Sequence, residues 1–177
     1  MNIILLGYRG SGKTSIGKKI ANQTWKDFVD VDDEIRKRFD GKTVAEIWET
    51  DGEPAYREVE VEVTQELVKR ENHVIGLGGG TAMQPAAFEA IKNAPDTKRI
   101  YLSCKPAVLA ERIAADPQSA ATRPALTEGS SGGDALEEIT AVLAERDPVY
   151  QELADAVFDV SYVDVAAAVA YLTRHHL

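Results

Sequence analysis

The pattern of apolar and polar residues along the chain predicts a parallel β-sheet flanked by helices. Short runs rich in β-branched residues alternate with stretches long enough for amphipathic helices. Because parallel strands are joined by helical crossovers, this alternation is typical of an α/β domain. The predicted strands cover Ile3–Leu6, Phe28–Val31, Val74–Leu77, Arg99–Leu102 and Ala156–Val160.

The first three predicted strands run into polar or glycine-rich segments at Gly7, Asp32 and Gly78, whereas the last two lack such segments. Ligands of open α/β sheets bind at the carboxyl ends of the strands, where neighbouring loops meet. We therefore expect the functional site where the ends of the first three strands lie side by side.

A helical insertion separates the second and third predicted strands. It spans about 40 residues, more than a plain crossover needs. Thr43-Val44-Ala45-Glu46 has the form of a capping box and predicts the start of one helix. Glu53-Pro54 predicts the start of a longer helix. The apolar face of that longer helix would carry Tyr56, Val59, Val63 and Leu67.

One low-complexity segment, Thr127–Gly133, is rich in glycine and serine, and a helix-capping sequence follows it at Asp134. Only about 40 residues come after it, too few for a second domain of ordinary size. A chain of 177 residues can bury a full core without a disulfide or a metal. We therefore predict a single domain, residues 1–177, in which this segment is a loop.

Charge and composition narrow the classes of partner. The chain has 29 acidic and 20 basic residues and a net charge of −9, which argues against a broad basic surface for nucleic acid or anionic membrane. The single cysteine, Cys104, permits no internal disulfide, and the three histidines show no metal-ligand spacing. No apolar run is long enough for a signal peptide or a membrane span. A reducing cytoplasm fits best, and an anionic ligand has to bind in a local pocket.

The segment Gly7–Thr14 matches the phosphate-binding pattern G-x-x-x-x-G-K-[ST]. An apolar strand precedes it and an amphipathic helix pattern follows. In such a loop, glycines let successive backbone N–H groups surround phosphate oxygens at a helix N-terminus. Lys13 then reaches the outer phosphates and Thr14 the magnesium ion. The alternative is a glycine-rich turn with an exposed lysine.

Two features restrict the class of nucleotide-binding protein. The chain has no Asn-Lys pair, which a guanine-selecting motif requires, and carboxylates follow the second predicted strand. Asp30 and Asp32 have period-two spacing, so both would point from the strand end toward the phosphate loop. One carboxylate would bind the metal and the other would accept a hydrogen bond from a substrate hydroxyl. Alternatively, Asp32 or Asp33 only caps the following helix.

The third predicted strand ends in a glycine triplet, Gly78–Gly80. Three glycines in a row let backbone approach a small ligand closely, because no Cβ atoms intervene. A flexible loop is the alternative explanation.

Together these motifs resemble the shikimate kinases, a family of small P-loop phosphotransferases. The resemblance extends from Asn2 to about Val160. It implies a P-loop NTPase fold with a five-stranded parallel sheet in the order 2-3-1-4-5. It also implies a substrate-binding insertion around residues 33–61, a lid around residues 112–133 and a monomer. The markers are Gly7–Thr14, Asp30-Val31-Asp32, Tyr56-Arg57-Glu58, Gly78–Gly80, Thr122-Arg123-Pro124 and Arg146-Asp147-Pro148-Val149-Tyr150.

The resemblance implies transfer of the γ-phosphoryl group of ATP to the 3-hydroxyl of shikimate. The products are ADP and shikimate 3-phosphate, on the route to chorismate and the aromatic amino acids. The catalytic candidates are Lys13, Arg123 and the base Asp32, and the cofactor is Mg²⁺, held by Thr14 and Asp30. The nucleotide-binding candidates are Gly10, Ser11, Gly12, Lys13, Thr14, Arg112 and Arg123. The shikimate-binding candidates are Asp32, Gly78, Gly79, Gly80 and the carboxylate-binding pair Arg57 and Arg146.

Two of these arginines also have a purely structural explanation. Arg57 could form a surface ion pair on its own helix with Glu53 or Glu60. Arg112 could pair with Asp116 at i+4 in the same way.

Two further expectations concern local structure. Asp147-Pro148 should end the helix that carries Arg146 and turn that side chain toward the site. Trp25, Trp48 and Tyr162 could stack on a ligand, but we expect core or hinge packing because bulky aromatic side chains mostly bury.

Two other functions stay open. One is a gluconate or nucleoside monophosphate kinase of the same fold, although such enzymes are not expected to combine Arg57 with the glycine triplet and Arg146. The other is a signalling domain that binds nucleotide without turnover, against which the intact Lys13 and Asp32 argue.

Overall fold

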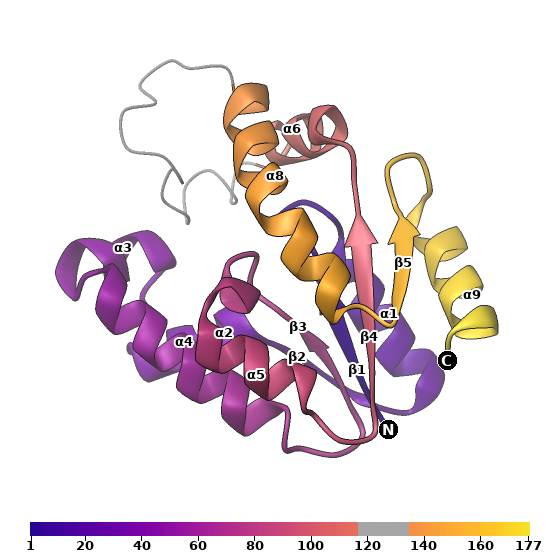
Figure 1. Ribbon diagram of the computed structural model, residues 1–177, viewed down its shortest axis with the longest axis horizontal. Coiled ribbons are helices and arrows are strands. Elements are labelled where there is room, and N and C mark those ends of the chain that lie inside the picture. The colour runs from indigo at the N-terminus through magenta and orange to yellow at the C-terminus, as the bar shows by residue number, and fades with distance from the viewer. Residues whose placement is uncertain (117–134) are drawn as a thin grey trace.

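The computed structural model describes residues 1–116 and 135–177. At its centre is a five-stranded parallel sheet with the order β2-β3-β1-β4-β5 (Figure 1). The predicted α/β class and the strand order 2-3-1-4-5 are therefore confirmed. The strands are β1 (Asn2–Leu6), β2 (Asp27–Asp30), β3 (His73–Gly76), β4 (Thr97–Ser103) and β5 (Ala156–Asp159).

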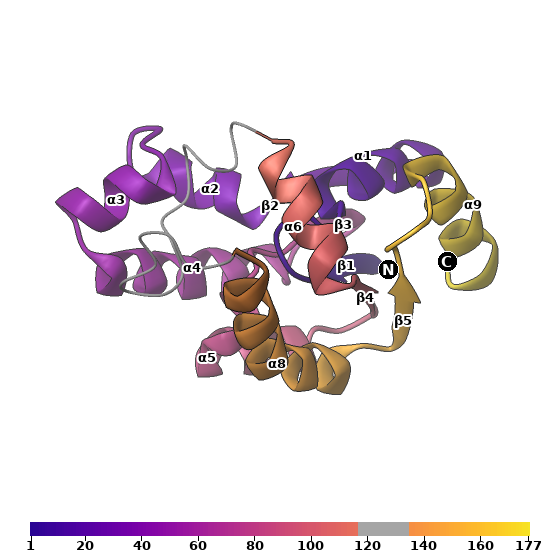
Figure 2. The ribbon, with the colours of Figure 1, turned by 90° about the horizontal axis from the view of Figure 1, so that it is seen from above.

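Helices cover both faces of the sheet. Figure 2 shows α1 and α9 on one side, and α4, α5 and α8 on the other. The described helices are α1 (Lys13–Thr24), α2 (Val31–Arg38), α3 (Val44–Thr50), α4 (Glu53–Leu67), α5 (Pro85–Lys92), α6 (Pro106–Ala114), α8 (Ala135–Leu153) and α9 (Val165–His175), with a 3₁₀ turn, η1, at Thr81–Met83.

The central strand β1 divides the core into two halves. Alternate side chains of a strand point to opposite faces. Ile3 and Leu5 pack with residues of α1 and α9, whereas Ile4 and Leu6 pack with residues of α4, α5 and α8. All four side chains are fully buried. Such burial on both faces explains why β1 is a continuous apolar run.

The helical insertion has the predicted local structure. Thr43 and Glu46 form the capping box at the start of α3: the Thr43 N–H donates to Oε2 of Glu46 at 2.7 Å, and the Glu46 N–H donates to Oγ1 of Thr43 at 3.2 Å. Helix α4 begins at Glu53, as predicted. Its predicted apolar face packs into the core, with Val59 partly buried and Tyr56, Val63 and Leu67 buried.

Two of the differences from the predicted boundaries have a clear physical cause. Strand β2 ends at Asp30 rather than Val31, because Asp30 caps α2 by accepting a hydrogen bond from the Asp32 N–H at 3.0 Å. Helix α8 does not end at Asp147 but continues through Pro148 to Leu153. Proline removes one helical hydrogen bond, yet Tyr150 and Leu153 beyond it are buried, and their packing holds the last turns in place.

The expectation that three aromatic side chains pack in the core or at a hinge holds only for Trp48. Trp48 packs against the core with its ring edge-on to Tyr56, the ring centroids being 6.3 Å apart. Trp25 is 89% exposed at the left-handed end of α1, and Tyr162 is 78% exposed beneath the Nζ of Lys105. Neither position is covered by a second layer of described structure, so aromatic character did not predict burial there.

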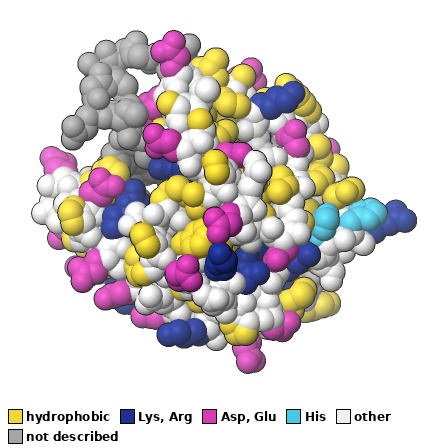
Figure 3. Space-filling view, viewed as in Figure 1, with side chains coloured by type: hydrophobic (Ala, Val, Ile, Leu, Met, Phe, Trp, Pro, Cys, Tyr) yellow, Lys and Arg dark blue, Asp and Glu magenta, His cyan; other side chains and the backbone are white. Residues whose placement is uncertain are grey.

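The surface carries mixed charge. On the face drawn in Figure 3, acidic side chains are interspersed with lysine and arginine. Among the described helices, none is long and apolar enough to span a membrane.

Candidate active site

Two adjoining pockets lie at the carboxyl ends of β1, β2 and β3, where the sequence predicts the site. Arg9, Asp32 and Gly79 line both. The pocket that we call the loop pocket is lined by Arg9, Gly10, Gly12, Lys13, Thr14, Ser15, Asp30, Asp32, Leu77, Gly79, Arg112, Ile113 and Asp116. The pocket that we call the aromatic pocket is lined by Arg9, Asp32, Val44, Trp48, Tyr56, Arg57, Glu60, Gly78, Gly79, Gly80 and Arg146.

The phosphate-binding motif forms the floor of the loop pocket. Gly10 and Gly12 have φ angles of 82° and 89°, a left-handed conformation that glycine adopts without strain. The chain turns there into α1, so the N-terminus of that helix faces the pocket. The ammonium group of Lys13 donates to the carbonyl oxygens of Gly7 at 2.7 Å and Tyr8 at 2.9 Å, which fixes it over the loop. This arrangement is suited to binding phosphate groups.

Asp30 offers oxygen ligands beside this loop. Its Oδ1 caps α2, and its Oδ2 accepts a hydrogen bond from the Thr14 hydroxyl at 3.0 Å. Burial raises the pKa of Asp30, the nearby Asp32 charge adds to the rise, and the hydrogen bond from Thr14 opposes it. A cation would relieve both unfavourable effects, so the pair fits a hard divalent ion. The described residues hold no cluster of three metal-ligating side chains. A Mg²⁺ ion here would take its remaining ligands from phosphates and water.

Asp32 lies at the junction of the two pockets. It belongs to the first turn of α2, not to a strand, so the period-two argument that paired it with Asp30 is wrong although both carboxylates do line the loop pocket. The alternative, in which Asp32 or Asp33 caps the helix, is also wrong, because Asp30 is the cap. Asp32 is 9% exposed, and its Oδ1 accepts a hydrogen bond from the Tyr56 hydroxyl at 3.2 Å.

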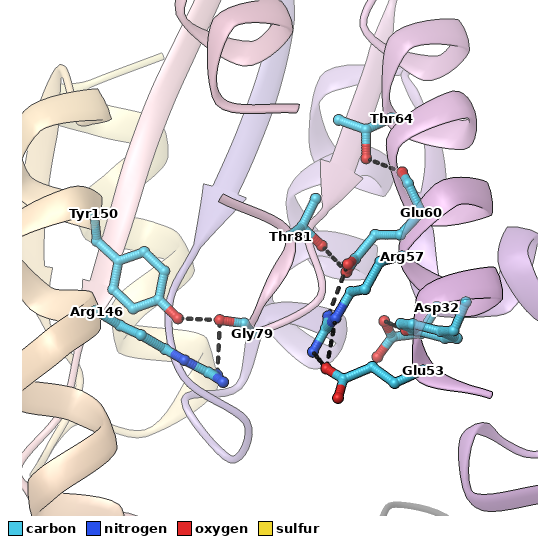
Figure 4. A network of polar contacts seen from close by, with 10 residues as sticks. Asp32, Glu53, Arg57, Glu60, Thr64, Gly79, Thr81, Arg146 and Tyr150 are labelled. Carbon is cyan, nitrogen blue, oxygen red and sulfur yellow. Dashed lines mark hydrogen bonds and ion pairs between the residues drawn. The ribbon is translucent and has the colours of Figure 1, made fainter. Parts of the chain in front are cut away.

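Arg57 projects from α4 into the wall of the aromatic pocket (Figure 4). Both ion pairs that the sequence suggests are present, with Glu53 at 3.1 Å and Glu60 at 2.8 Å. They do not make an ordinary surface contact, because Glu60 is 1% exposed and also accepts a hydrogen bond from the Thr81 hydroxyl at 2.7 Å. Burial raises the pKa of Glu60, whereas Arg57 and Thr81 oppose that rise. The buried carboxylate therefore orients a guanidinium at the pocket wall.

Arg146 faces the aromatic pocket from the other side (Figure 4). It lies within α8, and its Nη1 donates to the carbonyl oxygen of Gly79 at 2.9 Å. The Tyr150 hydroxyl, one turn later, donates to the same oxygen. Burial raises the pKa of Tyr150 to about 12, so the phenol keeps its proton and remains a donor. This double contact ties the glycine triplet to α8.

The glycine triplet is packed too tightly for other residues. A Cβ atom on Gly78 would lie 2.5 Å from Oδ1 of Asp32, and one on Gly80 would lie 2.9 Å from Nη1 of Arg57. On Gly79 the nearest atom would be Nη1 of Arg146, at 3.3 Å. The triplet therefore brings backbone against three candidate binding residues, which argues against the flexible-loop alternative.

We expect Gly78→Ala to lower turnover about 100-fold, because the new methyl group displaces the Asp32 carboxylate and small misplacements of reacting groups have effects of this size. Nucleotide affinity should change little, whereas thermal stability should fall, because the methyl group would also lie 2.9 Å from Oγ1 of the buried Thr81 and 3.2 Å from Oε1 of the buried Glu60. Steady-state kinetics and a thermal melt check this. Gly76→Ala is the matched control, because its Cβ atom would meet Asp30 and Phe28 only at 3.5 Å. Equal losses in the two variants would contradict the prediction.

The structure brings four of the five predicted cationic side chains to the two pockets: Lys13 and Arg112 line the loop pocket, and Arg57 and Arg146 line the aromatic pocket. The Nη2 of Arg112 donates to the carbonyl oxygen of Val160 at 2.7 Å, and its Nη1 lies 3.4 Å from the carbonyl oxygen of Gly10. The fifth, Arg123, and most of the predicted lid lie outside the described residues.

Sequence reasoning missed several lining residues, among them Arg9, Trp48 and Glu60. Arg9 and Trp48 were not singled out as site residues, and Glu60 was considered only as a surface partner of Arg57. A signal existed for Glu60, because it lies three residues after Arg57 on a helix whose apolar face runs through Tyr56 and Val63, close to the core. Nothing local distinguishes Trp48 from a core residue. Arg9 stands at a variable position of the phosphate-binding pattern.

Comparisons with known proteins identify the family. The sequence profile of the family described as "Shikimate kinase" matches residues 9–175. A shikimate kinase from Rhodopirellula baltica is 35% identical over 161 residues, covering 91% of this chain and 82% of the relative.

Among solved structures, the shikimate kinase of Acinetobacter baumannii, in complex with shikimate, has a TM-score of 0.86 at 27% identity, covering 98% of this chain and 90% of the other. The shikimate kinase of Bacteroides thetaiotaomicron has a TM-score of 0.83 at 30% identity, covering 98% and 97%. Matched over nearly its whole length in sequence and in structure, the chain belongs to the shikimate kinase family and is an ATP-dependent kinase.

Proposed function

We propose that this chain transfers the γ-phosphoryl group of ATP to the 3-hydroxyl of shikimate, with the nucleotide in the loop pocket and shikimate in the aromatic pocket. The products are ADP and shikimate 3-phosphate, an intermediate on the route to chorismate. The observation that carries the proposal is the junction: the two pockets meet at Asp32, which lines both. An acceptor hydroxyl at this carboxylate would point toward the phosphate-binding loop.

Recognition of the acceptor rests on two guanidinium groups. Arg57 and Arg146 line the aromatic pocket from opposite sides, on α4 and α8. A planar carboxylate accepts hydrogen bonds from guanidinium groups in well-defined directions, so this pair favours an acidic ring over a neutral sugar. Trp48 and Tyr56 supply apolar surface for the ring, and the backbone of Gly78–Gly80 offers hydrogen-bonding groups to its hydroxyls.

The residues of the loop pocket hold and neutralise the phosphates. Lys13 and Arg112 supply positive charge, and the loop at Gly10 and Gly12 with the first turn of α1 at Thr14 would bind the β- and γ-phosphates. When bound, Mg²⁺ neutralises charge on the phosphate oxygens, and Thr14 and Asp30 would hold it. Asp32 accepts the proton of the attacking hydroxyl. Arg123 remains a catalytic candidate on the family resemblance.

A coupled assay of ADP release tests the proposal. We expect release from MgATP only when shikimate is present. Stimulation by gluconate or a nucleoside monophosphate, with none by shikimate, would favour another kinase of the same fold. Nucleotide binding without turnover on any acceptor would favour a signalling domain. A monomer in the cytoplasm remains the expectation from the sequence and the family.

A further inference from the structure

Arg9 is a cationic residue at the point where the two pockets meet. It lies in the phosphate-binding loop between Tyr8 and Gly10, and it lines both the loop pocket and the aromatic pocket. Only two other described residues line both, the candidate base Asp32 and Gly79. Its backbone nitrogen is close to the glycine triplet, 3.5 Å from where a Cβ atom of Gly79 would lie. Arg9 is therefore placed between the nucleotide side and the acceptor side of the site.

The hydrogen-bonding state of Arg9 differs from that of the other arginines in the site. Arg57 is paired with carboxylates, and Arg112 and Arg146 each donate to a backbone carbonyl oxygen. In contrast, Nε of Arg9 is buried and has no acceptor among the described residues. Buried donors without a partner are rare in folded proteins and are costly to maintain. An arginine in this state points to an acceptor that arrives with a ligand.

The neighbouring phenol of Tyr8 does not neutralise the charge of Arg9. Burial raises the pKa of Tyr8, while the charges of Arg9 and Arg146 and a hydrogen bond with the Arg9 side chain oppose that rise. Tyr8 therefore stays neutral and does not cancel the guanidinium charge. Arg9 is half-buried and Asp32 is 9% exposed, so a cation here interacts more strongly with an anion than a fully exposed one would.

We propose that Arg9 binds the phosphoryl group as it crosses from ATP to the acceptor, and holds it both as the γ-phosphate of ATP and as the phosphate of the product. The proposal rests on the proposed function. In the transfer, the bond from phosphorus to the ADP oxygen breaks, the bond to the acceptor oxygen forms, and the hydroxyl proton passes to Asp32. Arg9 stays protonated throughout and stabilises the negative charge on the transferred oxygens.

This role makes a selective prediction about ligands. ATP and shikimate 3-phosphate both carry the group that Arg9 contacts, whereas ADP and shikimate do not. Loss of Arg9 should therefore weaken binding of the two phosphorylated ligands and spare the other two. A residue that only supports the loop would affect ATP and ADP alike.

The test compares Arg9→Met and Arg9→Lys with the control Lys19→Met, which removes the same charge from an exposed position on α1 that lines neither pocket. We expect Arg9→Met to lower kcat about 100-fold, within the range seen when one transition-state donor is lost. In calorimetric titrations it should weaken shikimate 3-phosphate and ATP about 10-fold, while shikimate and ADP stay within about twofold. Arg9→Lys keeps the charge but not the planar donor group, so its losses should be smaller.

Equal losses for phosphorylated and unphosphorylated ligands, or kinetics like those of the control, would overturn the proposal. If the unchanged protein shows no turnover with shikimate, the proposed function fails instead. The comparison of ATP with ADP then still decides whether Arg9 contacts the γ-phosphate.

Discussion

Replacement of Asp32 by asparagine is expected to lower kcat about 1,000-fold while MgATP affinity stays within about threefold, because the side chain acts on the acceptor hydroxyl and not on the nucleotide. An amide cannot take the hydroxyl proton. Asp32 lies at the junction of the loop and aromatic pockets, whereas the Thr14 hydroxyl contacts Asp30. We therefore expect Asp32 to accept the proton and Asp30 to bind the metal ion.

The structure makes asparagine a conservative substitution at this position. Its side-chain oxygen can still accept the hydrogen bond that the Tyr56 hydroxyl donates to Asp32 at 3.2 Å. The first turn of α2 loses one negative charge, which should lower the free energy of unfolding by only about 0.5 kcal/mol. A large loss of turnover would therefore report on chemistry rather than on folding.

The measurement is kcat in the coupled ADP-release assay, together with a nucleotide titration and a thermal melt. Asp33→Asn is the matched control, because Asp33 lies in the same turn of α2, is exposed and lines neither pocket. If Asp32→Asn weakened MgATP binding but kept normal turnover at saturating MgATP, Asp32 would instead be a metal ligand.

Local signals in the sequence predicted the elements that depend on local physics. The apolar alternation found all five strands to within two residues at each end. The capping box at Thr43 fixed the start of α3, since both of its hydrogen bonds join residues three apart. The strand order and the assignment of Arg57 and Arg146 to one site came from the family resemblance, because no local pattern reports which strands become neighbours.

What sequence reasoning missed depends on tertiary contacts. A proline usually ends a helix, but α8 continues past Pro148 because Tyr150 and Leu153 beyond it are buried. The sequence suggested an ion pair between Arg57 and Glu60. That its carboxylate is buried follows from the packing of Glu60 against Thr81, a residue 21 positions away. The sequence of α4 places Glu60 beside the apolar face that carries Tyr56 and Val63, but it does not show that Thr81 packs on that face.

Replacement of Arg57 by methionine should affect both the site and the fold. Loss of one guanidinium from the carboxylate-binding pair should raise the KM for shikimate about 50-fold, which corresponds to the free energy of one charge-assisted hydrogen bond. The same change leaves Glu60, 1% exposed, without its cation. Breaking a buried ion pair from one side should lower the free energy of unfolding by about 3 kcal/mol.

The double variant Arg57→Met/Glu60→Gln separates these two effects. A glutamine at position 60 is neutral and can still accept the hydrogen bond from the Thr81 hydroxyl through its Oε1. We expect the double variant to recover most of the lost stability but none of the shikimate affinity. Recovery of both would mean that Arg57 acts only by neutralising Glu60. The control Arg38→Met, which breaks an exposed pair with Glu66, should change neither quantity appreciably.

The pH dependence of stability gives a further test of the same pair. Burial raises the pKa of Glu60 above its ordinary value of 4.5, so the folded state holds this proton more tightly than the unfolded state. Its contribution to stability is therefore greatest below that value and is lost as the pH rises through the folded-state pKa. Removal of Arg57 deletes a cation that opposes the rise, so the loss should extend to higher pH. As the pH rises above 4.5, Arg57→Met should fall progressively further below the unchanged protein in free energy of unfolding, whereas the double variant, which has no carboxyl group at position 60, should lack this pH dependence. A constant gap for the single variant would show that the Glu60 carboxylate is not what destabilises it.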